Sequence, residues 1–240
     1  MTKAGKSKSG GRRTKGMPVV DFAVDPLLVG ADREFAAKFP PGLLGQCGVI
    51  PLRLFRDVGL VVAHTRAGGK GLERAQKATD IRLVSVPPIH DFGVDLFLRS
   101  MDSGDENGPP LWLPESRRGY LTRMGDFRRP ESAPLIAAVL LTSPLAATCP
   151  MLISTMGGEG HALYLHGTSG LKTGVRFPAG RLEDVLSRLR LEFGMDGKKS
   201  HAEPWMEGRG RQERGLEDFT GLHLPLEGGA FVIEPKGGKR

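Results

Sequence analysis

Cysteine is scarce in this sequence. Its 240 residues include two cysteines, Cys47 and Cys149, which lie 102 positions apart and belong to no C-x-x-C pair. Zinc sites are usually built from closely spaced cysteine pairs, and disulfide-stabilised small folds from several cysteines. We therefore expect two reduced, buried thiols, and neither a disulfide framework nor a cysteine-based metal site.

Residues for acid–base or metal chemistry are also thinly spread. The chain has six histidines, and the two closest in sequence, His161 and His166, are five positions apart. This odd spacing places them on opposite faces of a strand. The neighbouring acids Glu183 and Asp184 have the spacing of ordinary helix-surface residues rather than of an acid–base pair. The sequence thus predicts a protein that is not an enzyme and holds no metal and no cofactor.

A phosphate-binding P-loop is missing as well. Residues 167–173 read GTSGLKT and imitate the end of the G-x-x-x-x-G-K-[ST] motif. However, Leu171 separates Gly170 from Lys172, and a strand pattern follows where the motif needs a helix. These residues predict a hairpin turn, and we expect no ATPase motor in the chain.

No hydrophobic run is long enough to cross a membrane. The longest, residues 135–141, ends at Thr142, well short of the ~20 residues that a bilayer core requires. The basic residues at the start precede no apolar segment of the kind found in secretory signals. We expect a cytoplasmic protein without stable membrane insertion, and a peripheral position at the inner membrane is the alternative.

The positive charge is concentrated at the two ends. The formal net charge is +7, from 34 basic and 27 acidic residues. Six basic residues lie within residues 1–16 and three within 236–240, which leaves 25 basic against 27 acidic residues, a net charge of −2, for the rest. The body is therefore not a basic nucleic-acid platform. Residues 2–16 contain no large apolar side chain, and residues 1–17 are predicted to be a disordered, solubilising tail. Contact with nucleic acid or anionic lipid is an alternative.

Residues 40–101 carry the clearest succession of strands and helices. Residues 59–63 are apolar at nearly every position, which is typical of a central strand covered on both faces. Two prolines at 87 and 88 end the last strand, because proline cannot donate to a ladder. Strand patterns stand at 49–55, 59–63 and 81–86, and helical patterns at 70–77 and 89–101.

Three side-chain placements follow from periodicity in this half. Asp32 is predicted to cap a helix that runs through Phe39. In residues 49–55 the apolar positions alternate, so Arg53 falls on the outer face of a half-buried strand. The helix that follows the third strand is predicted to carry one apolar stripe, formed by Ile89, Phe92, Leu96 and Phe97.

The second half predicts a helix, three strands, a second helix and a closing hairpin. Ser132 is a suitable N-cap for the first helix, and Pro134 falls in its first turn. Apolar residues recur at helical spacing over 181–193, and Gly194 is placed to end that helix. The strands are predicted at 151–154, 162–166, 171–177, 219–224 and 230–233.

A linker is predicted between the two halves. Residues 102–114 are rich in glycine, proline and acids. Behind them comes a group of arginines interleaved with Tyr120 and Phe127, a mixture that can bind phosphates or acidic protein surfaces. The alternative is a set of solvated arginines on an irregular connection. These residues are Arg117, Arg118, Arg123, Arg128 and Arg129.

The first half resembles a known family in the order of its motifs. The segments GVIPL at 48–52, GLVVA at 59–63 and IRLVSV at 81–86, with a helix before the last and another after it, are similar to the N-terminal domain of the assembly ATPases of type II secretion and type IV pili. The family usually has Asp-Pro after its second strand, where this chain has Thr65 and Arg66.

The second half resembles the PAS-like domain that precedes the motor of the same ATPases. The helix at 134–147, the strand at 162–166, the segment VRFPAG at 175–180 and the helix at 185–191 follow its order. Most acidic and arginine residues that complete the nucleotide site in the family are absent here, and Arg176 alone retains the charge. The resemblance therefore implies Arg176 as a residual cofactor-binding residue, in a domain whose contact with ATP is lost.

Together these patterns predict an α/β protein of the α+β type. We expect two small sandwich domains of two or three layers, the second of them PAS-like. The predicted divisions are a disordered basic tail at 1–17, a secretion-ATPase N-terminal-like domain at 18–101, a linker at 102–130, a PAS-like domain at 131–235 and a basic tail at 236–240.

The function implied by the resemblance is docking without catalysis. We expect an adaptor or regulator of a type II secretion or type IV pilus-like machine, whose N-terminal domain binds an assembly ATPase or an inner-membrane platform protein. One alternative is a nucleotide or cyclic di-GMP sensor that uses Arg176 and the arginines of residues 117–129. Another is a nucleic-acid-associated protein that uses its basic tail. Which oligomer the chain forms does not follow from the sequence.

Overall fold

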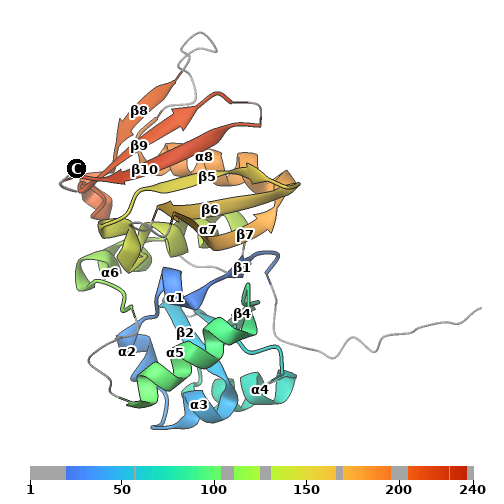
Figure 1. Ribbon diagram of the computed structural model, residues 1–240. Helices are drawn as coiled ribbons and strands as arrows, with labels where there is room; N and C mark the ends of the chain where they lie inside the picture. The colour runs from blue at the N-terminus through green and yellow to red at the C-terminus, as the bar shows by residue number, and fades with distance from the viewer. Residues whose placement is uncertain are drawn as a thin grey trace, which may run out of the picture.

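The protein is an α+β fold built on two sheets, as the sequence predicts (Figure 1). The computed structural model describes residues 20–56, 58–66, 68–103, 111–124, 131–165, 170–195, 205–226 and 228–236. The predicted tail at 1–17, His166, the turn residues 167–169, Arg128, Arg129 and the end of the second tail lie outside the described residues. Within the described residues, no helix combines the length and apolar character that crossing a bilayer requires.

The smaller sheet contains the three strands predicted for the first half. They are β2 (Val49–Leu54), β3 (Val58–Ala63) and β4 (Arg82–Val86), in the order β2-β3-β4. The central position of β3 is confirmed: it is antiparallel to β2 and parallel to β4. All but the last of its residues are buried, because both faces of the sheet are covered.

Four helices accompany this sheet. The predicted cap is confirmed, because the Asp32 carboxylate accepts hydrogen bonds from the backbone N–H groups of Glu34 (3.0 Å) and Phe35 (3.1 Å). The helix it starts is shorter than predicted, but the Phe35 and Phe39 rings still pack together, with centroids 5.3 Å apart. The helices are α2 (Arg33–Ala36), α3 (Leu43–Cys47), α4 (Gly68–Thr79) and α5 (Asp91–Ser103).

The apolar stripe predicted for α5 is wrong in part. Phe97 is fully buried, but Phe92 is 73% exposed and Leu96 is 44% exposed. The buried line instead runs through Val94 and Phe97, three positions apart. The prediction failed because the helix is rotated so that Val94 and Phe97 face the core. Two large apolar side chains, four positions apart, consequently lie on the outer face of α5.

The larger sheet has seven strands, all antiparallel to their neighbours. Their order is β1-β7-β6-β5-β10-β9-β8, and the edge strand β8 was not predicted. Their bounds are β1 (Ala23–Val24), β5 (Met151–Met156), β6 (Glu159–Leu165), β7 (Leu171–Pro178), β8 (Met206–Arg209), β9 (Phe219–Leu224) and β10 (Ala230–Pro235).

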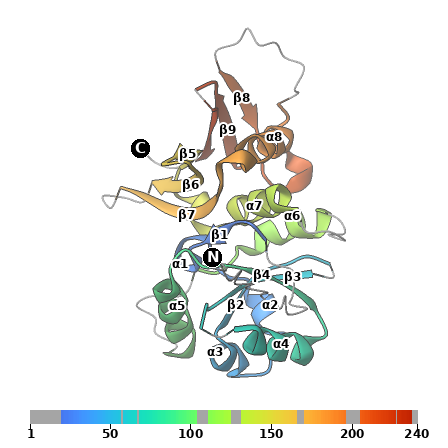
Figure 2. The same cartoon turned by 90° about the vertical axis from the view of Figure 1, so that its right-hand side faces the viewer.

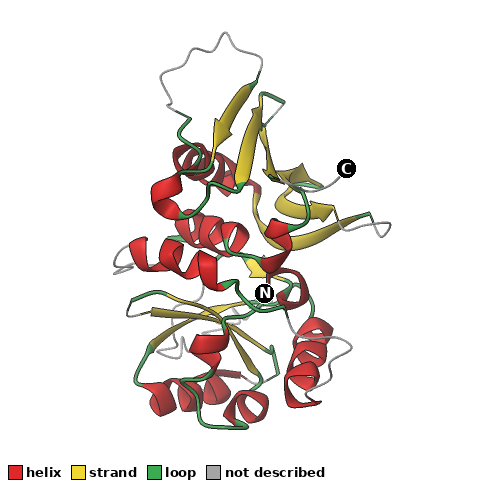
Figure 3. Cartoon of the chain, turned by 90° about the vertical axis from the view of Figure 1, so that its left-hand side faces the viewer, coloured by secondary structure: helices red, strands yellow, loops and turns green. Residues whose placement is uncertain are grey.

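Helices α7 (Ser132–Leu141) and α8 (Leu182–Glu192) pack on one side of this sheet (Figure 3). The shorter α1 (Pro26–Val29) and α6 (Arg118–Arg123), together with α7, lie between the two sheets (Figure 2). The predicted N-cap of α7 is wrong: Glu131 holds the cap position, without a capping hydrogen bond. The Ser132 hydroxyl instead donates to the Asp21 carboxylate, a partner distant in sequence that no local rule indicates.

Residues 20–25 join the two sheets. On one side β1 pairs with β7, with Ala23 opposite Arg176. On the other side the Val24 N–H donates to the Pro87 carbonyl (3.1 Å), and the Val24 carbonyl accepts from Ile89 N–H (2.8 Å). This segment precedes the smaller sheet in the chain but is a strand of the larger one. One hydrophobic cluster extends from Ile50 and Val84 in the smaller sheet to Phe231 in the larger.

Arg53 is fully buried between the two sheets, so its predicted position on an outer face is wrong. The pairing of β2 with β3 shifts register between Pro51 and Arg53, and such a bulge re-aims the side chains that follow it. The guanidinium donates to the carbonyls of Val29 (2.7 Å) and Gly30 (3.0 Å) and to the Thr142 hydroxyl. It therefore ties the carboxyl ends of α1 and α7 to β2.

Candidate functional site

Arg176, the candidate site residue, lies on β7 beside the junction of the two sheets. It is paired with Ala23 of β1 on one side and with His161 of β6 on the other. Directly paired residues project from the same face of a sheet, so Arg176 and His161 are neighbours. The Arg176 side chain is 40% exposed, and its Nε lies 3.7 Å from a carboxylate oxygen of Glu159. This contact is long and solvated, and it leaves the guanidinium available.

A cavity of about 350 Å³, here called the His161 cavity, opens beside these two residues. This volume is near the lower end of the range that is usual for small-molecule pockets. Basic side chains from three segments line it: His161 from β6, Lys172 and Arg176 from β7, and His90 from the turn after β4. Asp25, Leu28, Ile89 and Thr173 complete its wall.

Asp25 is the acidic group of the His161 cavity. Its Oδ1 accepts a hydrogen bond from the Leu27 N–H (3.0 Å) and so caps α1. Burial raises the pKa of Asp25, although the Leu27 hydrogen bond and the positive charges of His90 and Lys172 act in the opposite direction. The cavity thus combines one carboxylate with four basic side chains, and its balance of charge is positive.

A second hollow of about 530 Å³ lies on the other side of Arg176. Its wall contains Pro87 and Pro88 after β4 and Phe177 of β7, with Glu159 at the edge. Its described wall offers apolar surface and the ion pair of Arg176 with Glu159. No serine, threonine, cysteine or histidine is among the described residues that line it.

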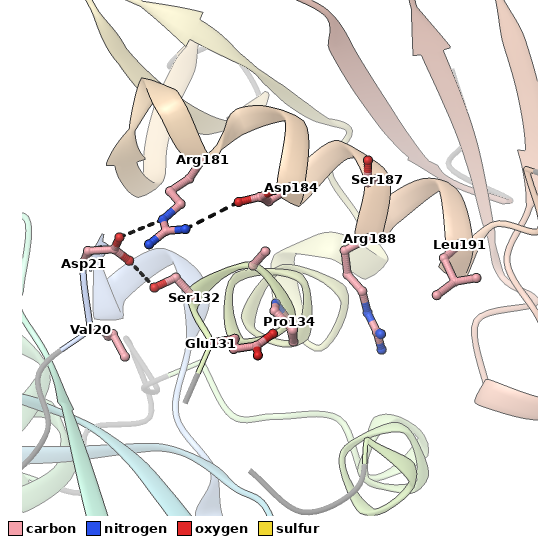
Figure 4. A pocket seen from close by; sticks show the side chains of 11 residues that line it. Val20, Asp21, Glu131, Ser132, Pro134, Arg181, Asp184, Ser187, Arg188 and Leu191 are labelled. Carbon is pink, nitrogen blue, oxygen red and sulfur yellow. Dashed lines mark hydrogen bonds and ion pairs between the residues drawn. The ribbon is translucent and has the colours of Figure 1, made fainter. Parts of the chain in front are cut away.

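A further cavity, of about 780 Å³, is here called the Asp21 cavity (Figure 4). It lies between the start of the described chain, the first turn of α7 and the outer face of α8. The Asp21 carboxylate accepts from Arg181 Nε (2.9 Å) and from the Ser132 hydroxyl, and Arg181 also reaches Asp184 (3.5 Å). Among the described residues, no histidine or cysteine lines this cavity, so it contains no serine–histidine pair for nucleophilic catalysis.

The Asp21 contacts give a pH prediction. Burial raises the pKa of Asp21, but the Ser132 hydrogen bond and the Arg181 guanidinium outweigh burial and lower it overall. A lowered folded pKa means that the carboxylate stabilises the fold above its unfolded pKa, and that this stability is lost as pH falls through the folded pKa. Asp21→Asn should therefore lower the free energy of unfolding by about 0.5–1 kcal/mol at pH 7, and the difference from wild type should shrink below about pH 4.

Urea unfolding of both proteins at pH 7 and pH 3 measures this effect. Glu73→Gln is the matched control, since Glu73 is an exposed acid on α4 and should change little at either pH. A difference between Asp21→Asn and wild type that is equal at both pH values would contradict the role of the carboxylate charge.

None of the described arginines of residues 117–129 lines a cavity together with Arg176. Arg117 is buried, lies 4.3 Å from the centre of the Phe219 ring and donates to the Gly215 carbonyl. Arg118 pairs with Asp32 (3.0 Å) and with Glu34. The solvated-arginine alternative is therefore wrong for both residues. Arg117 ties the turn before α6 to residues 215–219, and Arg118 ties the first residue of α6 to the start of α2.

Sequence reasoning identified Arg176 but missed most of the residues around it. His161 was considered only as a metal ligand, and no group of three potential ligands forms among the described residues. His90, Lys172 and Asp25 come from segments far apart in the chain and share no motif. One usable signal was present: residues 172 and 176 are an even number of positions apart on a predicted strand, which favours the same face. Their proximity to Asp25, however, depends on the pairing of β1 with β7.

Comparison with known proteins does not assign this chain to a family. No family model matches the chain, and no curated protein matches it. The resemblance to the assembly ATPases therefore stays a prediction.

Proposed function

We propose that this protein is a non-catalytic adaptor or regulator that docks through its first half, residues 18–101, onto an assembly ATPase or a platform protein of a type II secretion or type IV pilus-like machine. The observation that carries the docking role is the outer face of α5, where Phe92 is 73% exposed and Leu96 is 44% exposed. Exposed aromatic and aliphatic side chains at neighbouring positions are characteristic of binding surfaces.

The surroundings of this pair support a specific contact. Phe92 and Leu96 are four positions apart, so they lie one turn apart on the same face of the helix. Beside them Asp91 and Asp95 hold His64 between them, at 3.6 Å and 3.4 Å. An apolar centre with a charged rim is the usual layout of a protein–protein interface.

The order of elements supports the choice of partner. The chain runs α3, β2, β3, α4, β4, α5, which is the order that the resemblance to the secretion ATPase N-terminal domain implies. The resemblance and the exposed face concern the same segment. We therefore infer the partner from the resemblance and the contact surface from the exposed residues of α5.

The test is direct binding of the purified chain to the purified assembly ATPase, and to the cytoplasmic part of the platform protein, from the same cell. Phe92→Ser with Leu96→Ser should weaken binding about thirtyfold or more, because residues at the centre of an interface contribute most of its energy. Biolayer interferometry measures the change. Thermal unfolding should be nearly unaffected, since both side chains are exposed.

Leu226→Ser is the matched control. Leu226 is 59% exposed between β9 and β10, so its replacement removes a similar apolar area outside residues 18–101. Binding within about twofold of wild type is expected for this variant, since surface changes away from an interface cost little. Failure of the wild-type chain to bind either component, or equal losses in both variants, would refute the proposed docking.

A further inference from the structure

His161 contains a buried polar atom without a partner. The side chain is 9% exposed, and its Nδ1 makes no hydrogen bond within the described part of the chain. Buried polar atoms are almost always hydrogen-bonded, so each exception calls for a reason. The ring lines the His161 cavity, where a ligand would supply the missing partner.

The charges around the ring point to an anion. Arg176 is directly opposite His161 in the sheet, and its contact with Glu159 is 3.7 Å long. Lys172 and His90 form no salt bridge among the described residues, although both act on Asp25 through space. A guanidinium fork, an ammonium and two imidazoles facing one space are the donors that bind phosphate oxygens.

Asp25 limits which anion fits. Its Oδ1 is occupied by the Leu27 N–H, and its carboxyl group faces the same cavity as the basic residues. A ligand that carried negative charge on all sides would be repelled there. A ligand with a phosphate at the Arg176 side and a hydroxyl at the Asp25 side meets both requirements.

We propose that the His161 cavity binds a phosphate group, carried by a small phosphate ester that bears hydroxyl groups. Arg176 and Lys172 bind the phosphate oxygens, and His161 donates to them. Asp25 accepts a hydrogen bond from a ligand hydroxyl. The site is separate from the outer face of α5, so this proposal does not rest on the docking function.

Isothermal titration of the full chain with ribose 5-phosphate and with inorganic phosphate, at constant ionic strength, tests the proposal. Ribose is the neutral control. Saturable binding of ribose 5-phosphate is expected, with weaker binding of inorganic phosphate and none of ribose. Arg176→Gln should weaken binding about tenfold or more, because it removes a charge-assisted pair of hydrogen bonds. His161→Gln should also weaken it.

The matched control is Lys38→Gln, which removes an exposed positive charge outside the cavity and should leave the affinity unchanged. Thermal unfolding of each variant separates loss of the site from loss of the fold, and Arg176, being 40% exposed, should be replaceable without unfolding. If inorganic phosphate binds as tightly as the ester and both variants lose it, the site binds free phosphate, which upholds the phosphate site and rejects the ester. No binding of either probe, or equal affinity in wild type and Arg176→Gln, would overturn the proposal.

Discussion

Replacing Arg53 with methionine should lower the free energy of unfolding by about 3 kcal/mol or more. The guanidinium is fully buried and donates to the carbonyls of Val29 and Gly30 and to the Thr142 hydroxyl. Methionine fills a similar space but leaves these acceptors buried without donors. In a chain of this length the melting temperature should fall by roughly 10 °C.

The same contacts distinguish Arg53 from an ordinary buried ion pair. Its closest partners are neutral oxygens, and two of them lie at the carboxyl end of α1, where a helix carries partial negative charge. Burial lowers the pKa of Arg53 to about 10, against the opposing effects of Asp32 and Tyr164. The side chain is therefore still charged at pH 7. Arg53→Lys should fall between wild type and Arg53→Met, because one ammonium cannot reproduce the planar fork.

Calorimetric melting of the variants checks this expectation. Arg74→Met is the control, since Arg74 is exposed on α4 and bonds only to the Gln46 side chain among the contacts described. A melting temperature for Arg53→Met that matches the control would mean that the carbonyls find other donors, and that Arg53 does not hold the two sheets together.

The second large effect is expected at Gly174. A β-carbon at this position of β7 would lie 2.2 Å from Cε2 of Tyr164 and 2.8 Å from its Cδ2. The Tyr164 ring is fully buried and cannot swing into solvent. Burial also raises the pKa of Tyr164 to about 12, in keeping with its enclosed position. Gly174→Ala should therefore cost about 1–3 kcal/mol, as overpacked cores do, and lower the melting temperature by roughly 3–10 °C.

Gly180→Ala is a control of identical chemistry. No atom lies within 4 Å of a β-carbon built at Gly180, so this variant should stay within about 0.5 kcal/mol of wild type. Equal melting temperatures for the two alanine variants would show that the Tyr164 ring relaxes. The contact between β6 and β7 would then be looser than the structure indicates.

Both expectations concern the zone where the two sheets meet. Arg53 reaches α1 and α7 across it, and Gly174 accepts a hydrogen bond at its carbonyl from the Asp25 N–H (2.8 Å). The His161 cavity opens beside the same strand pairs. Changes that loosen the junction should therefore disturb this cavity.

The candidate site was predictable only in part. Arg176 was found because a family resemblance drew attention to it, and its strand was placed correctly. The other ionisable residues of the cavity stand at 25, 90, 161 and 172. They meet because β1 pairs with β7 while Val24 is hydrogen-bonded to Pro87 and Ile89 after β4. No local pattern in the sequence indicates these two pairings.

The sequence by itself determined the local structure. Alternating and continuous apolar runs predicted β2, β3 and β4, and the apolar spacing over 181–193 predicted α8. These elements form wherever short-range periodicity matches the face that becomes buried. Residues such as Asp32 could be assigned because a cap depends on the next three positions only.

Only the tertiary structure decided which faces are covered and which polar groups meet. Phe92 was assigned to the core and lies outside, whereas Arg53 was assigned to the surface and lies inside. In both cases the type of element was predicted correctly, but which side chains are buried depended on the rotation of the helix and on a strand bulge. These are set by packing between segments far apart in sequence, and no window of neighbouring residues contains that information.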